Sequence, residues 1–169
     1  LVSGLRSGGQ AYFALEVSDP KDPRFLWELN PETELLKMVK ATLPSKDKGV
    51  LDAAGQPDVR IGLSYGEPAM GTVVLTRSDG TRYERGVAIF GGGQAIDPSL
   101  TGPGQEYENQ GKAIYVVDVI TGEIIRRFIT HYEKDADVET ALTASVTGSV
   151  VASDDFPGSF ISRAFVGTN

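Results

Sequence analysis

The sequence contains no cysteine and a single histidine, His131. The absence of cysteine excludes disulfide bonds, thiol catalysis and cysteine-ligated zinc within these residues, and it leaves the redox compartment open. One histidine cannot by itself form a multi-histidine metal site. The sequence also has no run of about 18 apolar residues, so we expect no transmembrane segment in it.

Positive charge is scarce as well. The chain has 16 Lys and Arg against 23 Asp and Glu, for a net charge of −7. This balance gives no electrostatic footprint for nucleic acid or for an anionic membrane, so neither is an expected partner. An apolar content of 40% and a charged content of 23% are typical of a folded protein. Because the chain starts at Leu1 with neither Met nor a signal sequence, we expect a piece excised from a longer protein.

Glycine and proline are plentiful, at 20 and 9 residues, which favours many short strands over a few long helices. One hairpin is especially clear. Residues 113–119 are rich in β-branched and aromatic side chains, and residues 123–128 form the return strand. Between them, Asp118 and the pair Thr121-Gly122 predict a tight turn in which Gly122 takes a positive φ.

The chain repeats this hairpin. A strand at 11–17 and a return strand at 24–29 match it at an offset of 102 residues, from Gly9 to Gly111. Three apolar segments ending in glycine also align with one another, at residues 1–4, 88–91 and 164–167.

Other segments have their own patterns. Helical spacing predicts one short helix near 32–40, with Leu35, Met38 and Val39 on one side. Residues 45–59 have little apolar content and predict an exposed loop. Further strands are predicted at 61–65, 67–75, 82–93 and 159–167, with a turn at 78–80, a loop at 94–110, a polar stretch at 131–137, and a strand pair around Gly148 within 141–152.

The predicted fold class is all-β. The repeating unit has four strands, near residues 68–75, 87–90, 113–119 and 123–129, and a repeated four-stranded meander is typical of a β-propeller blade. Two halves of a sandwich are the alternative, which the repeated strand order disfavours. We therefore predict that residues 1–169 are part of one propeller domain, a fragment of four-stranded antiparallel blades. Its parts are the end of a blade at 1–30, a helix and loop insertion at 31–60, a complete blade at 61–130 and the start of the next at 141–169. The end strands of such a fragment would present unpaired edges.

These motifs resemble a known family. Residues 8–20, 65–68, 87–93 and 111–122, the last with its Val-Val-Asp-x-x-Thr-Gly core, resemble the blade motifs of PilY-type type IV pilus tip proteins. The resemblance covers nearly the whole chain apart from residues 31–60. It implies a C-terminal β-propeller in a bacterial cell-surface or envelope protein that acts in pilus assembly, adhesion and twitching motility.

The same resemblance raises the question of calcium. The family often has a calcium loop just before an Arg-x-aromatic-Val-Gly strand, which here is residues 163–167. The loop positions are Asp154, Phe156, Gly158 and Ser162, with Asp155 beside the first. Phe156 and Gly158 offer no side-chain oxygen, whereas calcium binds six to eight oxygens, so no calcium site is expected there.

A second resemblance is to quinoprotein dehydrogenases, whose propeller blades repeat an Asp-x-x-Thr-Gly turn followed by a docking tryptophan. Asp118, Thr121 and Gly122 match the turn, but Arg126 stands at the tryptophan position. We expect Trp27 and Phe128 to pack in the core between blades.

We interpret the remaining residues that could have catalytic or binding roles as structural. Residues 91–93 are three glycines after a strand with no helix behind them, which favours a sharp bend over a phosphate-binding loop. The acidic residues Asp97, Glu106 and Glu108, with Tyr107, predict a solvated loop. His131 is expected at the surface, and Glu123, Arg126 and Arg127 on an exposed strand face. No catalytic, cofactor-binding or metal-binding residue is predicted, and no cofactor.

The expected function is therefore non-enzymatic. The resemblance implies minor pilins or other pilus components as partners, with a host or abiotic surface as a further target. The two largest predicted loops, 31–60 and 94–110, are where we expect those contacts. The alternatives are a quinoprotein-like propeller enzyme and a structural scaffold of the cell envelope.

Overall fold

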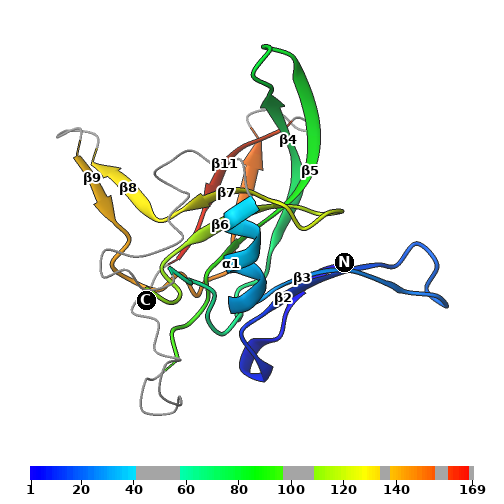
Figure 1. Ribbon diagram of the computed structural model, residues 1–169, viewed down its shortest axis with the longest axis horizontal. Coiled ribbons are helices and arrows are strands. Elements are labelled where there is room, and N and C mark those ends of the chain that lie inside the picture. The colour runs from blue at the N-terminus through cyan, green and yellow to red at the C-terminus, as the bar shows by residue number, and fades with distance from the viewer. Residues whose placement is uncertain (41–57, 97–108, 134–137, 155–159, 168–169) are drawn as a thin grey trace.

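The computed structural model describes residues 1–40, 58–96, 109–133, 138–154 and 160–167 (Figure 1). The chain is mostly β, as predicted, and its strands form antiparallel sheets. The first sheet contains β1 (Val2–Gly4), β2 (Tyr12–Glu16) and β3 (Arg24–Leu29), with a short 3-10 turn, η1 (Arg6–Gly8), between β1 and β2. The helix α1 (Pro31–Lys40) follows β3, close to its predicted position.

The second sheet has four strands in chain order: β4 (Ala69–Thr76), β5 (Arg82–Gly91), β6 (Ile114–Asp118) and β7 (Ile124–Phe128). Two smaller sheets follow. β8 (Thr130–Glu133) pairs with β9 (Val138–Ala141), and β10 (Val151–Asp154) pairs with β11 (Ile161–Phe165). The four-stranded meander predicted from the repeat is therefore present.

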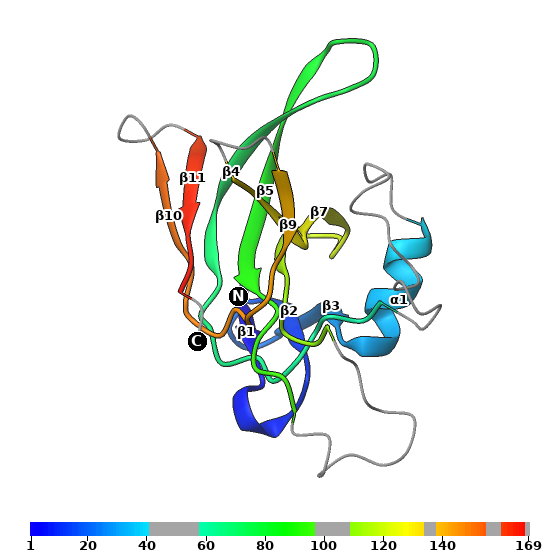
Figure 2. The same cartoon turned by 90° about the vertical axis from the view of Figure 1, so that its left-hand side faces the viewer.

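The four-stranded sheet is the middle layer, because its strands bury apolar side chains on both faces. Along β5, Ala88 and Phe90 face the first sheet, whereas Val87 and Ile89 face β10 and β11. β6 alternates in the same way. On the side of the first sheet, the ring of Phe90 stacks on Tyr12 at 4.0 Å and lies 5.6 Å from the ring of Tyr115. The helix α1 lies on the opposite side of this sheet from β10 and β11 (Figure 2).

The β6–β7 turn forms as the sequence predicts. Gly122 has φ +67°. The Asp118 carboxylate accepts hydrogen bonds from the amides of Ile120 at 2.9 Å and Thr121 at 2.8 Å, and its second oxygen pairs with Arg85. These bonds lower the pKa of Asp118 against the opposing effect of its burial. The Asp-x-x-Thr-Gly motif is thus turn architecture.

Two predictions about residues 58–65 are wrong. Asp58 and Val59 were expected in an exposed loop, but both are buried. Residues 61–65 were expected to form a strand, yet only Leu63 makes a β-bridge, to Gln94. This segment lies between the β1–β2 connection and the end of β5, where the Gly62 amide donates to the Gly92 carbonyl at 2.7 Å. Ser64, for example, accepts a hydrogen bond from the Leu5 amide at 2.7 Å.

The C-terminal part also differs from the prediction. No strand pair surrounds Gly148; instead β9 ends at Ala141 and β10 begins at Val151. The segment between them crosses the end of β5, where the Gly93 amide donates to the Val146 carbonyl at 3.0 Å. The polar stretch predicted at 131–137 includes the last three residues of β8, and residues 134–137 lie outside the described residues. Phe128, expected in the core, is 41% exposed.

Candidate functional site

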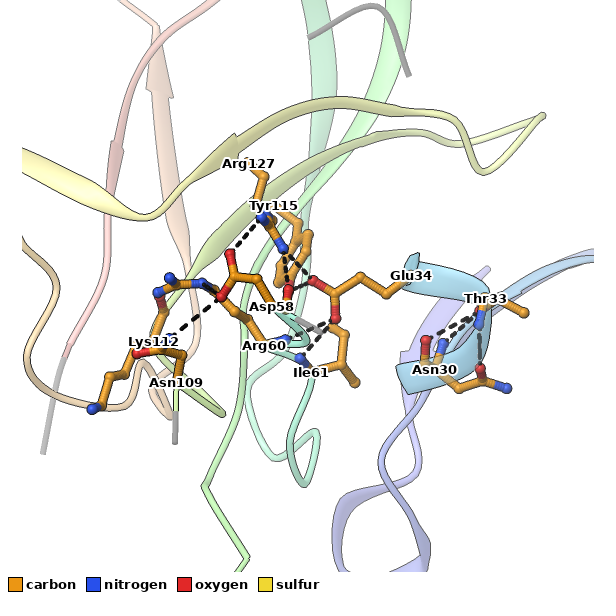
Figure 3. Close-up of polar contacts among 10 residues, drawn as sticks. All are labelled: Asn30, Thr33, Glu34, Asp58, Arg60, Ile61, Asn109, Lys112, Tyr115 and Arg127. Carbon is orange, nitrogen blue, oxygen red and sulfur yellow. Dashed lines mark hydrogen bonds and ion pairs between the residues drawn. The ribbon is translucent and has the colours of Figure 1, made fainter. Parts of the chain in front are cut away.

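Four of the five buried charged side chains among the described residues gather where α1 meets β6 and β7 (Figure 3), and the fifth, Asp118, ends β6. Two carboxylates and two guanidinium groups make up this cluster: Glu34, Asp58, Arg60 and Arg127. We call them the buried charge cluster. Since isolated charges cost several kcal/mol to bury, their arrangement must be explained by their partners.

Arg127 is at the centre of the cluster and is fully buried. Its Nη1 donates to Glu34 Oε1 at 2.9 Å and to the Asp58 carbonyl at 2.8 Å, and its Nη2 lies 2.9 Å from Asp58 Oδ2. The guanidinium of a β7 residue therefore joins α1, at the start of the insertion, to Asp58, near its end.

Glu34 receives four hydrogen bonds. Its Oε2 accepts from the amides of Arg60 at 2.9 Å and Ile61 at 3.0 Å. Its Oε1 accepts from Arg127 and from the Tyr115 hydroxyl at 2.6 Å. Burial, and then the negative charge of Glu34, raises the pKa of Tyr115 well above its ordinary value. The hydroxyl consequently stays protonated and remains a donor to the carboxylate.

Asp58 bridges the two arginines. Its Oδ1 pairs with Arg60 Nε at 2.9 Å, while its Oδ2 pairs with Arg127. Arg60 also donates from Nη1 to the Lys112 carbonyl at 3.0 Å. With two carboxylates and two guanidinium groups, the cluster is balanced in formal charge.

The residues at the start of α1 fix the position of Glu34. Asn30 caps α1: its side-chain oxygen accepts from the Thr33 amide at 2.8 Å, and the Thr33 hydroxyl accepts from the Asn30 amide at 2.8 Å. Pro31 then occupies the first helical position, where no amide hydrogen is needed. This fixed start directs Glu34, in the first turn, towards β6 and β7.

A second contact attaches the helix to the β6–β7 turn. Lys37 Nζ donates to the Gly122 carbonyl at 2.6 Å and lies 5.9 Å from the centre of the Trp27 ring. Trp27 is buried, and its indole N–H donates to the Val119 carbonyl at 3.1 Å. The predicted core position of Trp27 is confirmed, since it joins the first sheet to the second and its one donor is occupied.

The cluster can therefore act as a structural clamp. Each carboxylate oxygen of Glu34 and Asp58 accepts from a nitrogen or hydroxyl of the protein, so each already has a partner within the fold. Across the described ranges, no group of three or more His, Cys, Asp or Glu side chains is placed to hold a metal ion. The described helices also include none long and apolar enough to cross a membrane.

This cluster was not predicted from the sequence. Arg127 was expected on an exposed face with Glu123 and Arg126, and that prediction is wrong for Arg127. The cause is a β-bulge in β7: Val116 pairs with Arg126 and Val117 with Ile124, so Ile125 is the extra residue. The bulge shifts the alternation by one, and Ile124 and Arg127 face the same buried side. No pattern in a single sequence shows where a bulge falls.

The other residues singled out from the sequence lie in several different parts of the fold. The glycines after β5 lie where the backbone approaches closely: Gly93 has φ +91°, and a Cβ there would collide with the Leu63 carbonyl oxygen. Of the proposed calcium-loop positions, Asp154 ends β10 and Ser162 is exposed on β11. Phe156 and Gly158 lie outside the described residues, as do Asp97 and residues 106–108. His131 is in β8.

Comparisons with known proteins identify a solved structure with a similar fold. No protein-family model matches the chain, and no curated protein matches it either. Among solved structures, the chain is similar to the C-terminal domain of PilY1 from Pseudomonas aeruginosa, with 19% sequence identity and a TM-score of 0.52. The match covers 99% of this chain and 24% of that one, so the chain spans about a quarter of the solved structure. At this level of identity the similarity concerns the fold, and the fold is that of a segment of the PilY1 C-terminal domain.

Proposed function

We propose that this chain is part of a β-propeller in a type IV pilus-associated protein and works through protein contacts rather than catalysis. One observation carries the proposal. The chain shares its fold over 99% of its length with the PilY1 C-terminal domain, which is the family that the sequence motifs resemble. The motif resemblance and the fold similarity are separate lines of support.

The packing of the sheets supports the propeller assignment. The four-stranded sheet corresponds to one complete blade, β1–β3 to the last three strands of the preceding blade, and β10–β11 to the first two of the following blade. Successive blades of a propeller pack face to face, and here the middle sheet is buried against a neighbour on each side. The buried charge cluster then fastens the insertion at 31–60 to the outer strands of the complete blade.

A propeller of this kind is a rigid support for loops, and loops are where contacts are made. By the family resemblance, the proposed partners are minor pilins or other pilus components, with a host or abiotic surface as a further target. The proposed location is the bacterial cell surface or outer envelope. The proposed activities are pilus assembly, adhesion and twitching motility.

The loop between β5 and β6 allows a direct test. The two described residues Ile96 and Gln110, which flank 97–108, are held together, because the Ile96 amide donates to Gln110 Oε1 at 2.8 Å. Residues 97–108 can therefore be replaced by a short glycine-serine linker without moving either strand. In the native host, we expect this variant to lose surface pili or attachment while its protein level stays normal.

A matched control replaces residues 19–22, the exposed turn between β2 and β3, by the same linker. This control should leave pili and attachment unchanged. Normal pili, attachment and twitching in a strain that lacks the whole gene would contradict the pilus assignment itself.

A further inference from the structure

The hairpins β2–β3 and β6–β7 share a register as well as a sequence pattern. The pairing of β2 with β3 shifts between Ala14 and Leu15, and that of β6 with β7 shifts between Val116 and Val117. The two shifts are 102 residues apart, which is the offset of the sequence repeat. Each hairpin therefore has its β-bulge at the same place, and the residues on either side can be matched one to one.

This match shows that one face of the first sheet is open where its counterpart is buried. Four residues of the β6–β7 hairpin face the first sheet or the insertion and are at most 2% exposed: Tyr115, Val117, Ile124 and Arg127. The residues at the same register positions of the β2–β3 hairpin lie on the side away from the middle sheet: Phe13, Leu15, Phe25 and Glu28. Phe25 is 62% exposed, and the other three are half-buried. We call these four residues of β2 and β3 the open face.

In the second repeat, the end of the insertion lies against three positions of the sheet. Arg60 Nη1 donates to the Lys112 carbonyl at 3.0 Å, and Asp58 Oδ2 lies 2.9 Å from Nη2 of Arg127 (Figure 3). The Arg60 carbonyl oxygen lies beside Gly92, where a Cβ would be 2.8 Å from it. A short segment of chain therefore fills this corner of the middle sheet.

The matching corner of the first sheet is a recess of about 420 Å³. Its lining includes the counterparts of Gly92, Lys112 and Arg127, which are Leu5, Gln10 and Glu28. Leu5 matches Gly92 because each amide donates to the carbonyl of the corresponding alanine, Ala11 or Ala113. The position that a chain segment fills in the second repeat is thus open to solvent in the first.

The charge at this position differs between the repeats. In the second repeat the sheet supplies a base, Arg127, and the insertion supplies carboxylates. In the first repeat the sheet supplies an acid, Glu28, and Glu32 also lines the recess, whereas none of its described lining residues is basic. Glu28 accepts a hydrogen bond from the Asn30 side chain at 2.7 Å and has no ion pair within the described part of the chain. A covered carboxylate is costly without a positively charged partner, so we expect the group that covers Glu28 to be basic.

A purely structural role explains part of this arrangement. Glu28 supports Asn30, which caps α1, so the acid has a local function. That function does not explain why three apolar side chains of the open face, Phe25 among them, stand at register positions that are buried in the second repeat.

We infer that a further blade of the full-length protein packs on the open face, and that a segment of it enters the recess and brings an arginine or lysine to Glu28. A sheet is the occupant because the matching face of the middle sheet is already covered by a sheet. The contact at Glu28 is the buried charge cluster with its signs reversed, the acid on the sheet and the base on the segment. This inference rests on the propeller part of the proposed function.

The first test measures whether the open face is covered in the full-length protein. Phe25→Cys and Ile120→Cys are labelled with a maleimide, and peptide mass spectrometry locates the label. The two native side chains are almost equally exposed here, at 62% and 66%. Phe25→Cys should react about tenfold more slowly than Ile120→Cys, because only transient opening exposes a thiol that a blade covers.

The second test measures the charge of the covering group, with a substitution that keeps the size of the side chain. Glu28→Gln leaves a basic partner buried and unpaired, so the melting temperature of the full-length protein should fall by about 5 °C. Glu84→Gln is the matched control, because Glu84 is an exposed acid on β5, and it should change the melting temperature by less than about 1 °C. An unchanged or higher melting temperature for Glu28→Gln would overturn the inference, since no base then meets Glu28.

Labelling of Phe128→Cys separates this inference from the propeller assignment, because Phe128 lies on the other side of the middle sheet from the open face. Fast labelling at Phe25→Cys with slow labelling at Phe128→Cys would overturn the inference alone. Fast labelling at both positions would contradict the propeller as well. Protection of Phe25→Cys that disappears on dilution would mean that a second copy of the protein covers the open face, which would also overturn the inference.

Discussion

At the scale of single residues, the structure depends most on Arg127. A fully buried guanidinium is tolerated because Glu34 and Asp58 surround it at hydrogen-bonding distance. Such an arrangement contributes little net stability compared with an apolar core, but removing one partner leaves the other charges buried and unpaired. The cluster therefore acts mainly by fixing one position for the insertion.

Replacing Arg127 by methionine should be severely destabilising. Glu34 and Asp58 would keep their burial but lose their shared partner, and we expect a loss of about 3–5 kcal/mol in the free energy of unfolding. Urea denaturation followed by tryptophan fluorescence measures it, because Trp27 is the one tryptophan of the chain. Arg126→Met, at the neighbouring position of β7, is the control and should cost less than about 1 kcal/mol. Similar losses in the two variants would mean that Arg127 has no special role.

The raised pKa of Tyr115 predicts how the stability of the protein depends on pH. Its pKa is raised in the folded state, whereas an exposed tyrosine in the unfolded chain titrates near pH 10. Above about pH 10 the unfolded chain therefore releases a proton that the folded protein keeps, and stability decreases as pH rises. The contribution is fully present below that pH and is lost progressively above it.

Tyr115→Phe should make this alkaline loss of stability shallower, although the variant starts from a lower stability because Glu34 loses a donor. Unfolding free energies measured from pH 8 to pH 11 would show the difference in slope. Parallel curves for the two proteins would refute the assigned linkage.

At the scale of elements, the β6–β7 turn and α1 depend on each other. Gly122 has φ +67°, and a Cβ on it would collide with the Trp27 ring and lie 2.8 Å from Lys37 Nζ. Gly80 in the turn between β4 and β5 has φ +84°, but nothing lies within 4 Å of its Cβ position. The two glycines share a backbone conformation and differ only in their surroundings.

Alanine at these two positions separates backbone strain from packing. Gly80→Ala should cost about 1 kcal/mol, the strain of the left-handed conformation. Gly122→Ala should cost about 2–4 kcal/mol, because Trp27 and Lys37 must also move. Thermal unfolding of both variants gives the comparison, and equal costs would show that Trp27 and α1 do not pack on the turn.

Some elements of the fold were predictable from the sequence, and others were not. Three elements were predictable because each has a local signal in the sequence. These are the β6–β7 hairpin, with its alternation and turn residues, the β4–β5 turn at Gly80, and α1, with its helical spacing. β8 and β9 were missed because their residues are too polar to alternate visibly. Arg127 was misplaced because the register shift at Ile125 arises from pairing between strands, which local sequence does not encode. Glu34 looked like an ordinary acid in the first turn of a helix, and only the tertiary fold reveals its partners.

At the scale of the whole molecule, the described residues leave the outer half of the middle sheet uncovered on one side. A groove of about 450 Å³ lies between it and β11, and its lining is largely apolar: Val73, Ile89, Ile114, Val116, Phe128, Leu142, Ile161, Ala164 and Val166. β10 and β11 are only two strands, whereas the middle sheet has four. In a propeller, the remaining two strands of that blade would cover the groove, which also explains the exposure of Phe128.

Residues 1–169 expressed alone should therefore bind the dye anilinonaphthalene sulfonate, with a rise in fluorescence and a tendency to associate. The full-length protein should not bind it at the same site, and Phe128→Glu should reduce the signal of the fragment. Equal dye binding by the fragment and the full-length protein would mean that no further strands cover the groove.

The central claim is that the β1–β3, β4–β7 and β10–β11 sheets belong to consecutive blades of one propeller. The most direct measurement is an experimental structure of the full-length protein, by crystallography or electron cryo-microscopy. We expect two more antiparallel strands beside β10 and β11 in that structure. We also expect this blade, the β4–β7 sheet and the β1–β3 sheet to be arranged around one central axis with further blades. A structure in which β10 and β11 stay two-stranded, or in which the sheets form a closed sandwich, would contradict it.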